Sequence, residues 1–552
     1  MERDTAGFDI VVAGSGAAGM TAALTAARLG LSVVVIEKAG TFGGSTARSG
    51  GGIWAPGNIV LRKAGVADTP GQARDYLAHV AVGVPAELRQ ALLEHGPDML
   101  GLVMAMTPLR FAWVPGYADY YPEAPGGLAC GRSIEPVPFD GRVLGAELDR
   151  LARPYLPSPV AITQAEYKWL SLGRHPRAVV AGARVGVRAA RTRLLGHRML
   201  SLGQALAAGL RAGLLASGVP VWLDTPLTGL EVRDGRVCGV RATRDGEPLL
   251  IRARRGVLLA TGGFERNEEM RRRHQRAPVG TEWTTGAPSN TGDGIRAGLD
   301  LGAATGLLDD AWWGPSIPLP GGPYFCLAER SLPGCILVNG AGQRFVNESA
   351  PYVDAVHAMY DGNTPENPHI PAWLIFDQRY RDRYVFAGLP PGKALPRRWY
   401  AAGAVVRADD LAGLARETGV ESDGLVKTVA RFNEFAAAGR DEDFGRGGSA
   451  YDRYYGDPRL ANPNLAPLAR PPFYAVKIVP GDLGTKGGLR TDERARVLRP
   501  DGTPIEGLYA AGNASASVMG HSYAGAGATI GPAMTFGYIA ALTMAGPPER
   551  AG

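Results

Sequence analysis

A glycine-rich turn between a short apolar run and a helix-forming run is the feature that most constrains this chain. The apolar run Phe8–Ala13 is bounded by glycine, which predicts a buried strand. The stretch 17–29 is rich in alanine and leucine and predicts a helix. A second apolar run, Val33–Ile36, is rich in valine and predicts a strand parallel to the first. We therefore expect an α/β chain whose first unit is strand, helix, strand.

The glycines of this turn have the G-x-G-x-x-G spacing of a dinucleotide site. Gly14 permits the tight turn, Gly16 lets the backbone approach a pyrophosphate, and Gly19 lets the helix pack on the strand. The helix N-terminus favours the anion because its first N–H groups are free. Glu37 ends the second strand, where a carboxylate accepts a hydrogen bond from a ribose hydroxyl. The alternative is a glycine-rich turn in some other α/β unit, but the strand, the helix and the acid together favour a dinucleotide.

Composition excludes several other classes of protein. The 552 residues leave room for several domain-sized units. The 77 glycines show no period, which indicates tight turns rather than collagen or disorder. The net charge of +6 is modest for this length and does not point to nucleic acid. The four cysteines have no C-x-x-C spacing, which argues against a disulfide scaffold and a metal site and fits a reducing compartment. With no signal-peptide core near Met1, we expect a cytoplasmic protein.

One long segment resembles a membrane span by charge alone. Between Glu506 and Glu549 the chain has no Asp, Glu, Lys or Arg. Asn513, His521, Pro532 and many glycines interrupt it, so it lacks the continuous apolar run that a spanning helix needs. We expect instead a buried loop, strand and helix around a ligand.

A second cluster of glycines and hydroxyls follows the acid at the end of the second strand. It comprises Gly43–Thr46 and Ser49–Gly51. Hydroxyls and exposed N–H groups suit phosphates and the edge of a flavin, although a flexible loop is the alternative for this cluster alone. Together with Glu37 and Lys38, the cluster resembles the FAD-binding flavoproteins of the fumarate reductase and succinate dehydrogenase group.

Three later segments also resemble motifs of this group. The strand and turn at 255–263 resemble the segment that returns the chain to the adenosine half of FAD. The segment 290–294 resembles T-G-D-G, whose aspartate supports the flavin side, although a plain helix N-cap is the alternative. The strand and turn at 507–513 are typical of closure on FAD. No histidine attachment site is evident, so the resemblance implies non-covalent FAD.

The residues that the resemblance assigns to FAD are Gly14, Ser15, Gly16, Ala17, Ala18, Gly19, Glu37, Lys38, Gly43, Gly44, Ser45, Thr46, Ser49, Gly50, Gly51, Ala260, Thr261, Gly262, Gly263, Asp293, Gly512, Asn513, Ala528 and Ile530.

Composition shifts divide the chain into three segments. From about Ala311 the sequence becomes rich in tryptophan, proline and other aromatic residues, and near Asp482 it returns to glycine-rich motifs. We predict a Rossmann-like FAD-binding domain in two parts, 1–310 and 483–552, with an inserted α+β catalytic domain at 311–482. Within the insertion, Leu411 to Phe435 is predicted to be one helix.

A basic stretch at 174–198 follows a different pattern. Four arginines fall on one helical face, namely Arg177, Arg184, Arg188 and Arg191. A neighbouring face is apolar and carries Val180, Ala183, Val187, Ala190 and Leu194. Such a helix can lie on an anionic membrane surface, or it can be solvated or paired with acids elsewhere in the fold. No aromatics interleave the arginines, so nucleic acid is not expected.

Tyrosine-containing motifs narrow the resemblance to one family. The loop 119–121 taken alone is typical of surface or interface tyrosines. Together with 347–352, 482–489 and 523–527, however, it resembles the 3-ketosteroid Δ1-dehydrogenases, also called 3-oxosteroid 1-dehydrogenases. The family often has proline where this chain has Ala524, and we do not expect that difference to disturb the site. The resemblance covers nearly the whole chain.

The resemblance implies a role for each site residue. Tyr523 and the Gly527 backbone N–H polarise the C3 carbonyl of a 3-ketosteroid. Tyr352 takes the proton from carbon 2, and Tyr120, or else its neighbour Tyr121, assists it by lowering its pKa. FAD accepts the hydride from carbon 1. The aromatics from Trp312 to Tyr324 are candidates for an apolar wall.

Three other functions fit these motifs less well than 1,2-desaturation of a 3-ketosteroid does. A fumarate reductase-like enzyme is expected to carry a histidine before the glycines of 484–488, where none is present. A 3-ketosteroid Δ4-(5α)-dehydrogenase uses similar tyrosines, and a scaffold with FAD as a structural ligand leaves the tyrosines unexplained. The expected partners are a 3-ketosteroid, an electron acceptor such as a quinone, and a membrane surface at the inner face of the cell membrane for 174–198.

Overall fold

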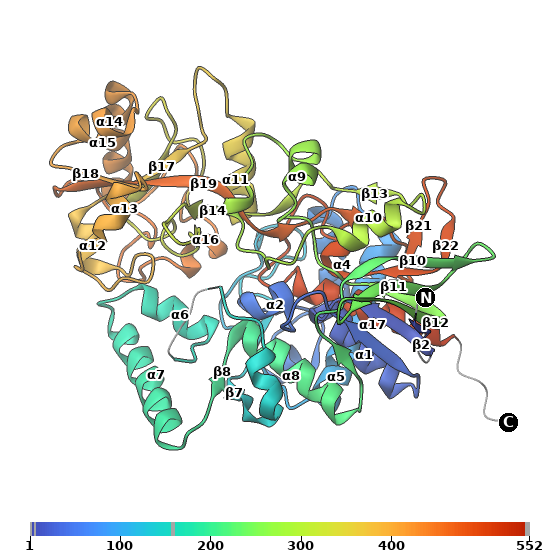
Figure 1. Ribbon diagram of the computed structural model, residues 1–552. Coiled ribbons are helices and arrows are strands. Elements are labelled where there is room, and N and C mark those ends of the chain that lie inside the picture. The colour runs from blue at the N-terminus through green and yellow to red at the C-terminus, as the bar shows by residue number, and fades with distance from the viewer. Residues whose placement is uncertain (1–2, 5–6, 156–159, 547–552) are drawn as a thin grey trace.

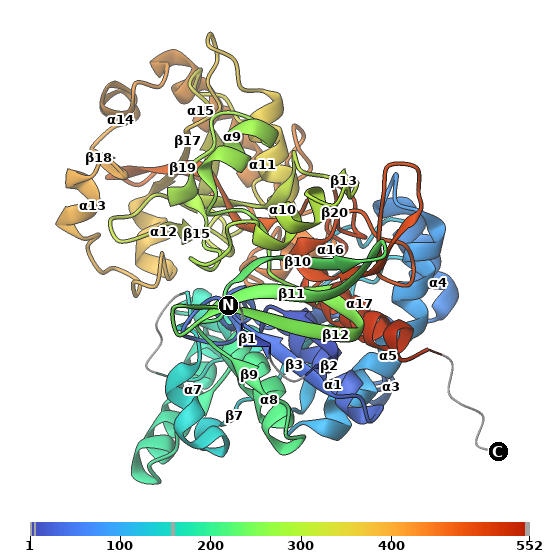
Figure 2. The ribbon, with the colours of Figure 1, turned by 45° about the vertical axis from the view of Figure 1, so that its right-hand side comes forward.

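The computed structural model describes residues 3–4, 7–155 and 160–546, which form two adjoining parts (Figure 1). The lower right part of Figure 1 contains a mixed sheet with the N-terminus and α1 beside it. The upper left part contains an antiparallel sheet with its own helices. Figure 2 shows the same two parts after a turn about the vertical axis.

The predicted strand–helix–strand unit is present in the first part. It consists of β2 (Phe8–Ala13), α1 (Ala17–Arg28) and β3 (Val33–Ile36). β2 and β3 pair in parallel, with Ile10 opposite Val33. All four residues of β3 are buried, which explains their apolar character.

This unit lies inside a larger mixed sheet. Its neighbours pair in the order β10-β11-β12-β2-β3-β9, with β22 parallel to β12 and β21 antiparallel to β22. The pairs β10-β11 and β11-β12 are antiparallel, whereas β12-β2, β2-β3 and β3-β9 are parallel. The additional strands are β1 (Arg3–Asp4), β9 (Val221–Trp222), β10 (Leu227–Arg233), β11 (Arg236–Arg244), β12 (Glu247–Leu259), β21 (Arg496–Leu498) and β22 (Pro504–Ala510).

The second part is built on an antiparallel sheet. Its main order is β15-β14-β19-β17-β16, and β18 also pairs with β19. The strands are β14 (Ala311–Ile317), β15 (Tyr324–Phe325), β16 (Cys335–Val338), β17 (Ala372–Asp377), β18 (Val405–Ala408) and β19 (Phe473–Thr485). The α/β fold with a Rossmann-like sheet and an α+β insertion is therefore confirmed, while the exact boundaries at 310 and 482 stay a prediction.

Helices surround both sheets. In the first part they are α2 (Gly44–Arg48), α3 (Ile59–Lys63), α4 (Pro70–Val80), α5 (Ala86–Met106), α6 (Gln164–Ser171), α7 (Pro176–Leu194), α8 (Leu202–Ala216), α9 (Glu268–His274), α10 (Asp293–Leu299) and α17 (Ile530–Ala545). In the second part they are α11 (Tyr352–Asp361), α12 (Gln378–Arg383), α13 (Arg397–Ala401), α14 (Leu411–Thr418), α15 (Ser422–Ala438) and α16 (Ala450–Tyr454). Short strands and 3₁₀ turns used below are β4 (Ile53–Trp54), β6 (Ser133–Pro136) and η3 (Gly512–Ala514).

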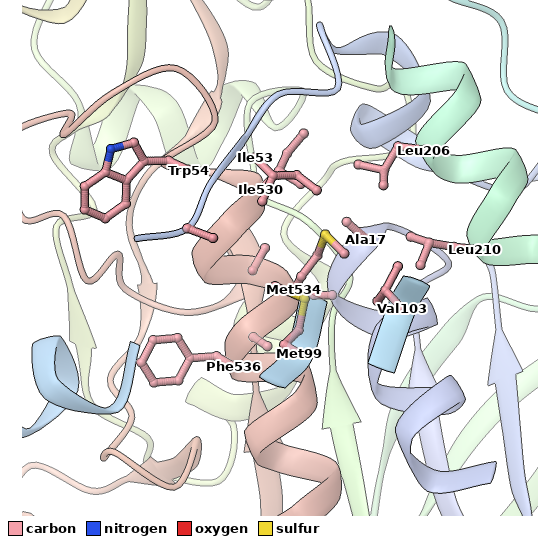
Figure 3. Close-up of a cluster of buried hydrophobic side chains, with 14 of the residues drawn as sticks. Ala17, Ile53, Trp54, Met99, Val103, Leu206, Leu210, Ile530, Met534 and Phe536 are labelled. Carbon is pink, nitrogen blue, oxygen red and sulfur yellow. The ribbon is translucent and has the colours of Figure 1, made fainter. Parts of the chain in front are cut away.

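The uncharged segment near the C-terminus becomes a buried helix. Met534 of α17 points toward Met99 and Val103 of α5, and Phe536 points to the other side of α17 within the same buried cluster (Figure 3). A Cβ at Gly537 would lie 2.3 Å from the carbonyl oxygen of Ala18, so only glycine lets α17 approach α1 this closely. The segment lacks charges because it is core. Within 3–4, 7–155 and 160–546, no helix combines the length and hydropathy that a membrane crossing requires.

One helix prediction is wrong. The predicted helix from Leu411 to Phe435 is two helices, α14 and α15, separated at Gly419. Gly419 has a left-handed φ of +76° and ends α14, and Glu421 then accepts hydrogen bonds from the first N–H groups of α15. The apolar periodicity continues across the break because both helices pack on the same core, so the periodicity alone did not reveal it.

Candidate active site

The glycine-rich turn between β2 and α1 is closed by backbone on two sides and open on a third. A Cβ at Gly14, whose φ is +111°, would lie 2.2 Å from the Ala260 carbonyl oxygen. A Cβ at Gly19 would lie 2.0 Å from the Gly14 carbonyl oxygen, whereas one at Gly16 meets nothing closer than Thr46 Oγ1 at 3.6 Å. The open side lies at the N-terminus of α1, where free N–H groups attract an anion.

The carboxylate predicted to bind ribose already organises the turn. Glu37 Oε2 accepts hydrogen bonds from Ser15 N (3.0 Å) and Ser15 Oγ (2.6 Å), and Oε1 accepts one from Ala39 N (2.9 Å). Glu37 therefore fixes the position of Ser15, a role that the sequence analysis did not predict. Its contact with ribose stays a prediction.

The second acidic residue assigned to the cofactor lies beside the end of β3. Lys38 Nζ donates to Asp293 Oδ2 (2.8 Å) and to Thr291 Oγ1 (2.6 Å). The alternative that Asp293 is a plain N-cap is wrong, because Gly292, in a left-handed conformation, is the N-cap of α10 and Asp293 is its first helical residue. The ion pair thus links the two segments that the resemblance assigned to FAD.

The hydroxyls of the second glycine cluster bind the protein itself. The first part of this cluster, Gly44 to Thr46, lies in the short helix α2, whereas Ser49, Gly50 and Gly51 follow that helix. Ser45 Oγ accepts from Ala287 N (3.0 Å) and Asn290 Nδ2 (3.1 Å). Thr46 Oγ1 accepts from Ala17 N (2.9 Å). These hydroxyls position α2 against α1 and the 287–290 loop, which leaves the backbone of the cluster for a phosphate.

The remaining residues assigned to FAD lie on neighbouring elements. Ala18 lies in α1, Gly43 precedes α2, Ser49, Gly50 and Gly51 follow α2, Thr261, Gly262 and Gly263 follow β12, Gly512 and Asn513 lie in η3, and Ala528 and Ile530 lie before and at the start of α17.

These elements fit an FAD molecule. Thr261 Oγ1 is buried and has no hydrogen-bond partner in the protein, which leaves it free for a ligand. A small cavity is lined by Gly512, Asn513, Thr529 and Trp312. The cavity adjoins the start of α1, since a Cβ at Gly512 would lie 3.4 Å from Ala18 Cβ. The residues present therefore fit the group.

A buried acid that the sequence analysis missed adjoins this set. Glu265 Oε1 accepts from Asn290 Nδ2 (2.7 Å), and a Cβ at Gly263 would lie 2.7 Å from Glu265 Oε2. Burial, with the negative charge of Asp482, raises the pKa of Glu265 to about 7. The sequence signal that could have indicated Glu265 is its position directly after the glycine turn, in the run Gly262–Glu265.

Three tyrosines from distant segments meet near the junction of the two parts. Tyr120 OH donates to Tyr352 OH at 3.0 Å. The ring of Tyr523 stacks on that of Tyr120, with centroids 5.1 Å apart, and lies 5.4 Å from that of Tyr352. All three are buried, so the surface or interface interpretation of the 119–121 loop is wrong. The neighbouring Tyr121 instead donates to Asp354 Oδ1 (2.9 Å), so Tyr120 is the partner of Tyr352.

The environment sets the protonation of these phenols. Burial raises the pKa of Tyr352 well above its usual value of 10, and the hydrogen bond from Tyr120 opposes that rise. Burial also raises the pKa of Tyr523, while hydrogen bonds from Thr529, Tyr352 and the Gly527 N–H lower it. Tyr523 is therefore neutral near pH 7, as a hydrogen-bond donor must be, and the Gly527 N–H faces its hydroxyl.

The loops that carry the tyrosines are joined through one carbonyl. The oxygen of Ala524 accepts from Tyr120 N (3.1 Å) and from Tyr76 OH (2.6 Å). A side chain at position 524 is not needed for either bond, so alanine in place of proline leaves both intact. The Tyr120 loop is held further by Asp119, which accepts from Trp54 Nε1 (3.0 Å) and pairs with the buried Arg132.

The buried Lys486 side chain forms a hydrogen bond with the loop that carries Tyr523. Lys486 Nζ donates to the Ser522 carbonyl (3.0 Å) and lies 3.2 Å from Asp310 Oδ2. Although burial opposes it, Lys486 with His357 and His521 keeps the pKa of Asp310 well below its usual range. The sequence analysis did not predict these residues, because position 310 lies about 175 residues from 486 along the chain and only the fold brings them together.

Of the aromatics predicted as an apolar wall, Trp312 packs edge-on against Tyr523, with centroids 4.9 Å apart. Phe325, one residue beyond the predicted range, packs against Tyr352 at 5.1 Å. Trp313 points to the other side of β14 and packs on Tyr360 in the core of the second part. This follows from the alternation of side chains along a strand, which a count of aromatics ignores.

Comparison with known proteins gives a consistent result. Residues 9–530 match the FAD binding domain family model. The chain is 57% identical to a 3-oxosteroid 1-dehydrogenase of Mycolicibacterium smegmatis, over 98% of this chain and 97% of the relative. It is also 57% identical to a 3-oxosteroid 1-dehydrogenase of Mycobacterium tuberculosis, over 98% of each. The crystal structure of 3-ketosteroid Δ1-dehydrogenase from Sterolibacterium denitrificans in complex with 1,4-androstadiene-3,17-dione matches with a TM-score of 0.93 and 42% identity, over 98% of this chain and 100% of that one.

Proposed function

Because the chain belongs to the FAD-binding flavoprotein family that includes the 3-oxosteroid 1-dehydrogenases, we propose that it introduces a double bond between carbons 1 and 2 of 3-ketosteroids. The observation that carries this proposal is the hydrogen bond between Tyr120 and Tyr352 beside the ring of Tyr523. Two phenols joined at their hydroxyls, next to a third that faces a backbone N–H, supply a base and an oxyanion site in one buried cluster.

The reaction divides between these groups. Tyr523 OH and the Gly527 N–H donate hydrogen bonds to the C3 carbonyl oxygen, which stabilises the negative charge that develops there and acidifies carbon 2. Tyr352, once its hydroxyl has lost its proton, takes the carbon 2 proton at the phenolate oxygen and becomes the neutral phenol. Tyr120 donates to that oxygen and stabilises the phenolate form. Bound FAD supplies the acceptor for the hydride of carbon 1. Trp312 and Phe325 exclude water from the A ring.

A product assay tests this function. We expect the purified, flavin-loaded protein to convert 4-androstene-3,17-dione to 1,4-androstadiene-3,17-dione in the presence of an artificial electron acceptor. Chromatography of the products, with a saturated 5α-3-ketosteroid as a second substrate, separates the alternatives. Insertion of a double bond only at carbons 4 and 5 of the saturated steroid would show a Δ4-(5α)-dehydrogenase instead. Absence of turnover, with fumarate reduced, would show a fumarate reductase-like enzyme.

The helix α7 supports a peripheral contact with a membrane. It projects at the lower left of Figure 1 and contacts α6, and its buried residues are Ala178, Ala181 and Val185. Its outer side exposes apolar residues at helical spacing, with Val180 51%, Val187 69% and Leu194 85% exposed. Exposed apolar side chains flanked by arginines favour the interface of an anionic bilayer. A quinone acceptor dissolved in that bilayer then lies close to the protein.

The arginines of α7 are not equivalent. Arg188 forms a bidentate pair with Glu166 of α6, through Nη2 to Oε1 (2.6 Å) and Nη1 to Oε2 (3.0 Å), and also donates to the Ala161 carbonyl. It therefore joins the two helices and is not available to lipid. Arg184 and Arg191 are exposed, so they are the cations that face a membrane.

This assignment predicts the lipid dependence of two variants. We expect Arg184→Glu/Arg191→Glu and Val180→Asn/Val187→Asn each to lower co-sedimentation with anionic liposomes several-fold, since one removes the electrostatic and the other the apolar contribution. Turnover of a detergent-solubilised steroid should be unchanged. Arg416→Glu, an arginine of α14 in the other part, is the matched charge control. Equal recovery of all proteins, on neutral and anionic liposomes alike, would contradict the contact.

A further inference from the structure

A cavity separate from the catalytic tyrosines lies where the α6–α7 hairpin meets the rest of the protein. Its volume is about 390 Å³, and it is lined by Pro115, Gly116, Lys168, Trp169, Arg177 and Tyr454. Three helices contribute to it, namely α6, the start of α7 and the end of α16, together with the loop at 115–116. The hairpin lies below the second part in Figure 1, on the side from which α7 projects.

Two cations face this cavity over aromatic rings. Lys168 Nζ lies 4.1 Å from the ring centroid of Tyr454 and 5.1 Å from that of Trp169. The Arg177 guanidinium lies 4.6 Å from the Trp169 ring. Burial, and then the charge of Arg177, lowers the pKa of Lys168 to about 8. The two cations therefore disfavour one another in the protein alone.

No acid in the described part of the chain pairs with either cation. The acids nearest in the fold are already engaged. Glu166 pairs with Arg188. Glu135 accepts from the N–H groups of Gln164 (2.6 Å) and Ala165 (3.3 Å) at the start of α6. The cavity therefore combines apolar walls with two positive charges that lack a negative partner.

A continuous line of aromatic rings joins this cavity to the catalytic site. Tyr454 stacks on Tyr117, with centroids 4.2 Å apart and planes 1° from parallel. Tyr117 in turn packs on Tyr120 at 6.4 Å, and Tyr120 stacks on Tyr523. The cavity residue Gly116 directly precedes Tyr117. A rigid four-ring steroid held by its C3 carbonyl at Tyr523 has its C17 end far from that carbonyl, and this line of rings leads from Tyr523 to the two cations.

We propose that this cavity is a subsite for the C17 side chain of 3-ketosteroids whose side chain ends in a carboxylate. Lys168 and Arg177 bind the carboxylate, and the rings of Trp169 and Tyr454 contact the aliphatic part of the side chain. The carboxylate neutralises two cations that otherwise repel each other. Its binding is therefore more favourable than that of an isolated ion pair on the surface. The proposal rests on the proposed function, since it takes the A ring to lie at Tyr523.

Matched substrates test the subsite. The holoenzyme is assayed with 3-oxochol-4-en-24-oic acid, with the methyl ester of that acid, and with 4-androstene-3,17-dione, which has no side chain. We expect Lys168→Met and Arg177→Gln each to lower kcat/KM for the acid by about tenfold, since hydrogen bonds to charged groups are the stronger ones. The losses for the ester and the dione should stay within about twofold. Arg193→Gln, a change on the same helix but outside the cavity, should leave kcat/KM for all three substrates unchanged.

The outcomes separate the subsite from the function. If the wild type does not turn over the dione, the proposed function fails. If it turns over the dione but the variants lower acid and ester turnover equally, the charge-specific subsite is wrong. Unchanged acid turnover in both variants would also overturn it. Turnover of the dione by each variant, with its FAD content, shows that the variant is folded.

Discussion

Tyr352→Phe is expected to abolish flavin reduction by the steroid almost completely, while the steroid still binds. The substitution removes the hydroxyl that we propose as the base for the carbon 2 proton and keeps the ring, which packs on Phe325 and Tyr523. Packing and FAD binding should therefore survive. The side chains with the largest effect on the pKa of this hydroxyl are themselves phenols, namely Tyr523, Tyr117 and Tyr120. General base catalysis contributes about 10²–10⁴ in rate. The measurement is anaerobic flavin reduction in a single turnover.

The matched control for this variant is Tyr120→Phe. It keeps Tyr352 and removes the hydrogen bond to its oxygen. The rate rises with pH as Tyr352 loses its proton, and Tyr120 lowers the pKa of that group. Without Tyr120 the pKa of Tyr352 is higher, so the pH–rate profile should move to higher pH. The loss in the rate of flavin reduction should therefore be smaller at high pH than at low pH. Flavin reduction by Tyr352→Phe at close to the wild-type rate would show that Tyr120 or a water is the base.

The sequence predicts the nucleotide half of the fold because its signals are local. The turn at Gly14, Gly16 and Gly19 needs only the strand before it and the helix after it, and all three glycines lie where the spacing places them. The buried helix α17 follows from the absence of charge over a long segment. Local signals are less reliable in the second part, where one apolar periodicity runs across the break at Gly419.

The supporting residues of the site could not be predicted, because each acts through a distant partner. Asp310 and Lys486 meet below the Tyr523 loop, although nothing in the sequence near either one indicates the other. Glu265 acquires its raised pKa from burial and from Asp482, which is over two hundred residues away. Thr529 lies between two residues assigned to FAD and was not predicted to contact Tyr523. Its hydroxyl lies 2.9 Å from that of Tyr523.

The basic helix shows how tertiary contacts change the meaning of a periodic pattern. The sequence places Arg188 on one face with Arg184 and Arg191, and predicts either lipid or an acid as the partner of that face. In the structure the arginines of this face differ, because Arg188 pairs with Glu166 whereas the other two remain exposed. A variant that reverses all three charges would disrupt the hairpin as well as any lipid contact, and its failure to bind liposomes would not identify the cause.

Tyr523→Phe is expected to fail in a different way from Tyr352→Phe. The ring stacks on Tyr120 and packs against Trp312, and phenylalanine keeps both contacts. The substitution removes one of two donors to the C3 oxygen and leaves the Gly527 N–H. By analogy with other oxyanion sites the rate of flavin reduction should fall by about 10²–10³, with little change in the dissociation constant of the steroid. The residual rate should keep the pH dependence of Tyr352, since the base is untouched.

Thr529→Val separates the donor role of Tyr523 from the packing of its loop. Thr529 Oγ1 and Tyr523 OH share a hydrogen bond at 2.9 Å, and the substrate carbonyl must compete for the Tyr523 proton wherever Tyr523 is the donor. Removing Thr529 therefore leaves the proton of Tyr523 free for the steroid, and we expect a loss far smaller than in Tyr523→Phe. In the double variant, Thr529→Val should add almost nothing, because the two changes then act on one hydrogen bond. Additive losses of similar size, or a Tyr523→Phe enzyme within a few-fold of the wild type, would show that Tyr523 positions the loop and does not polarise the carbonyl.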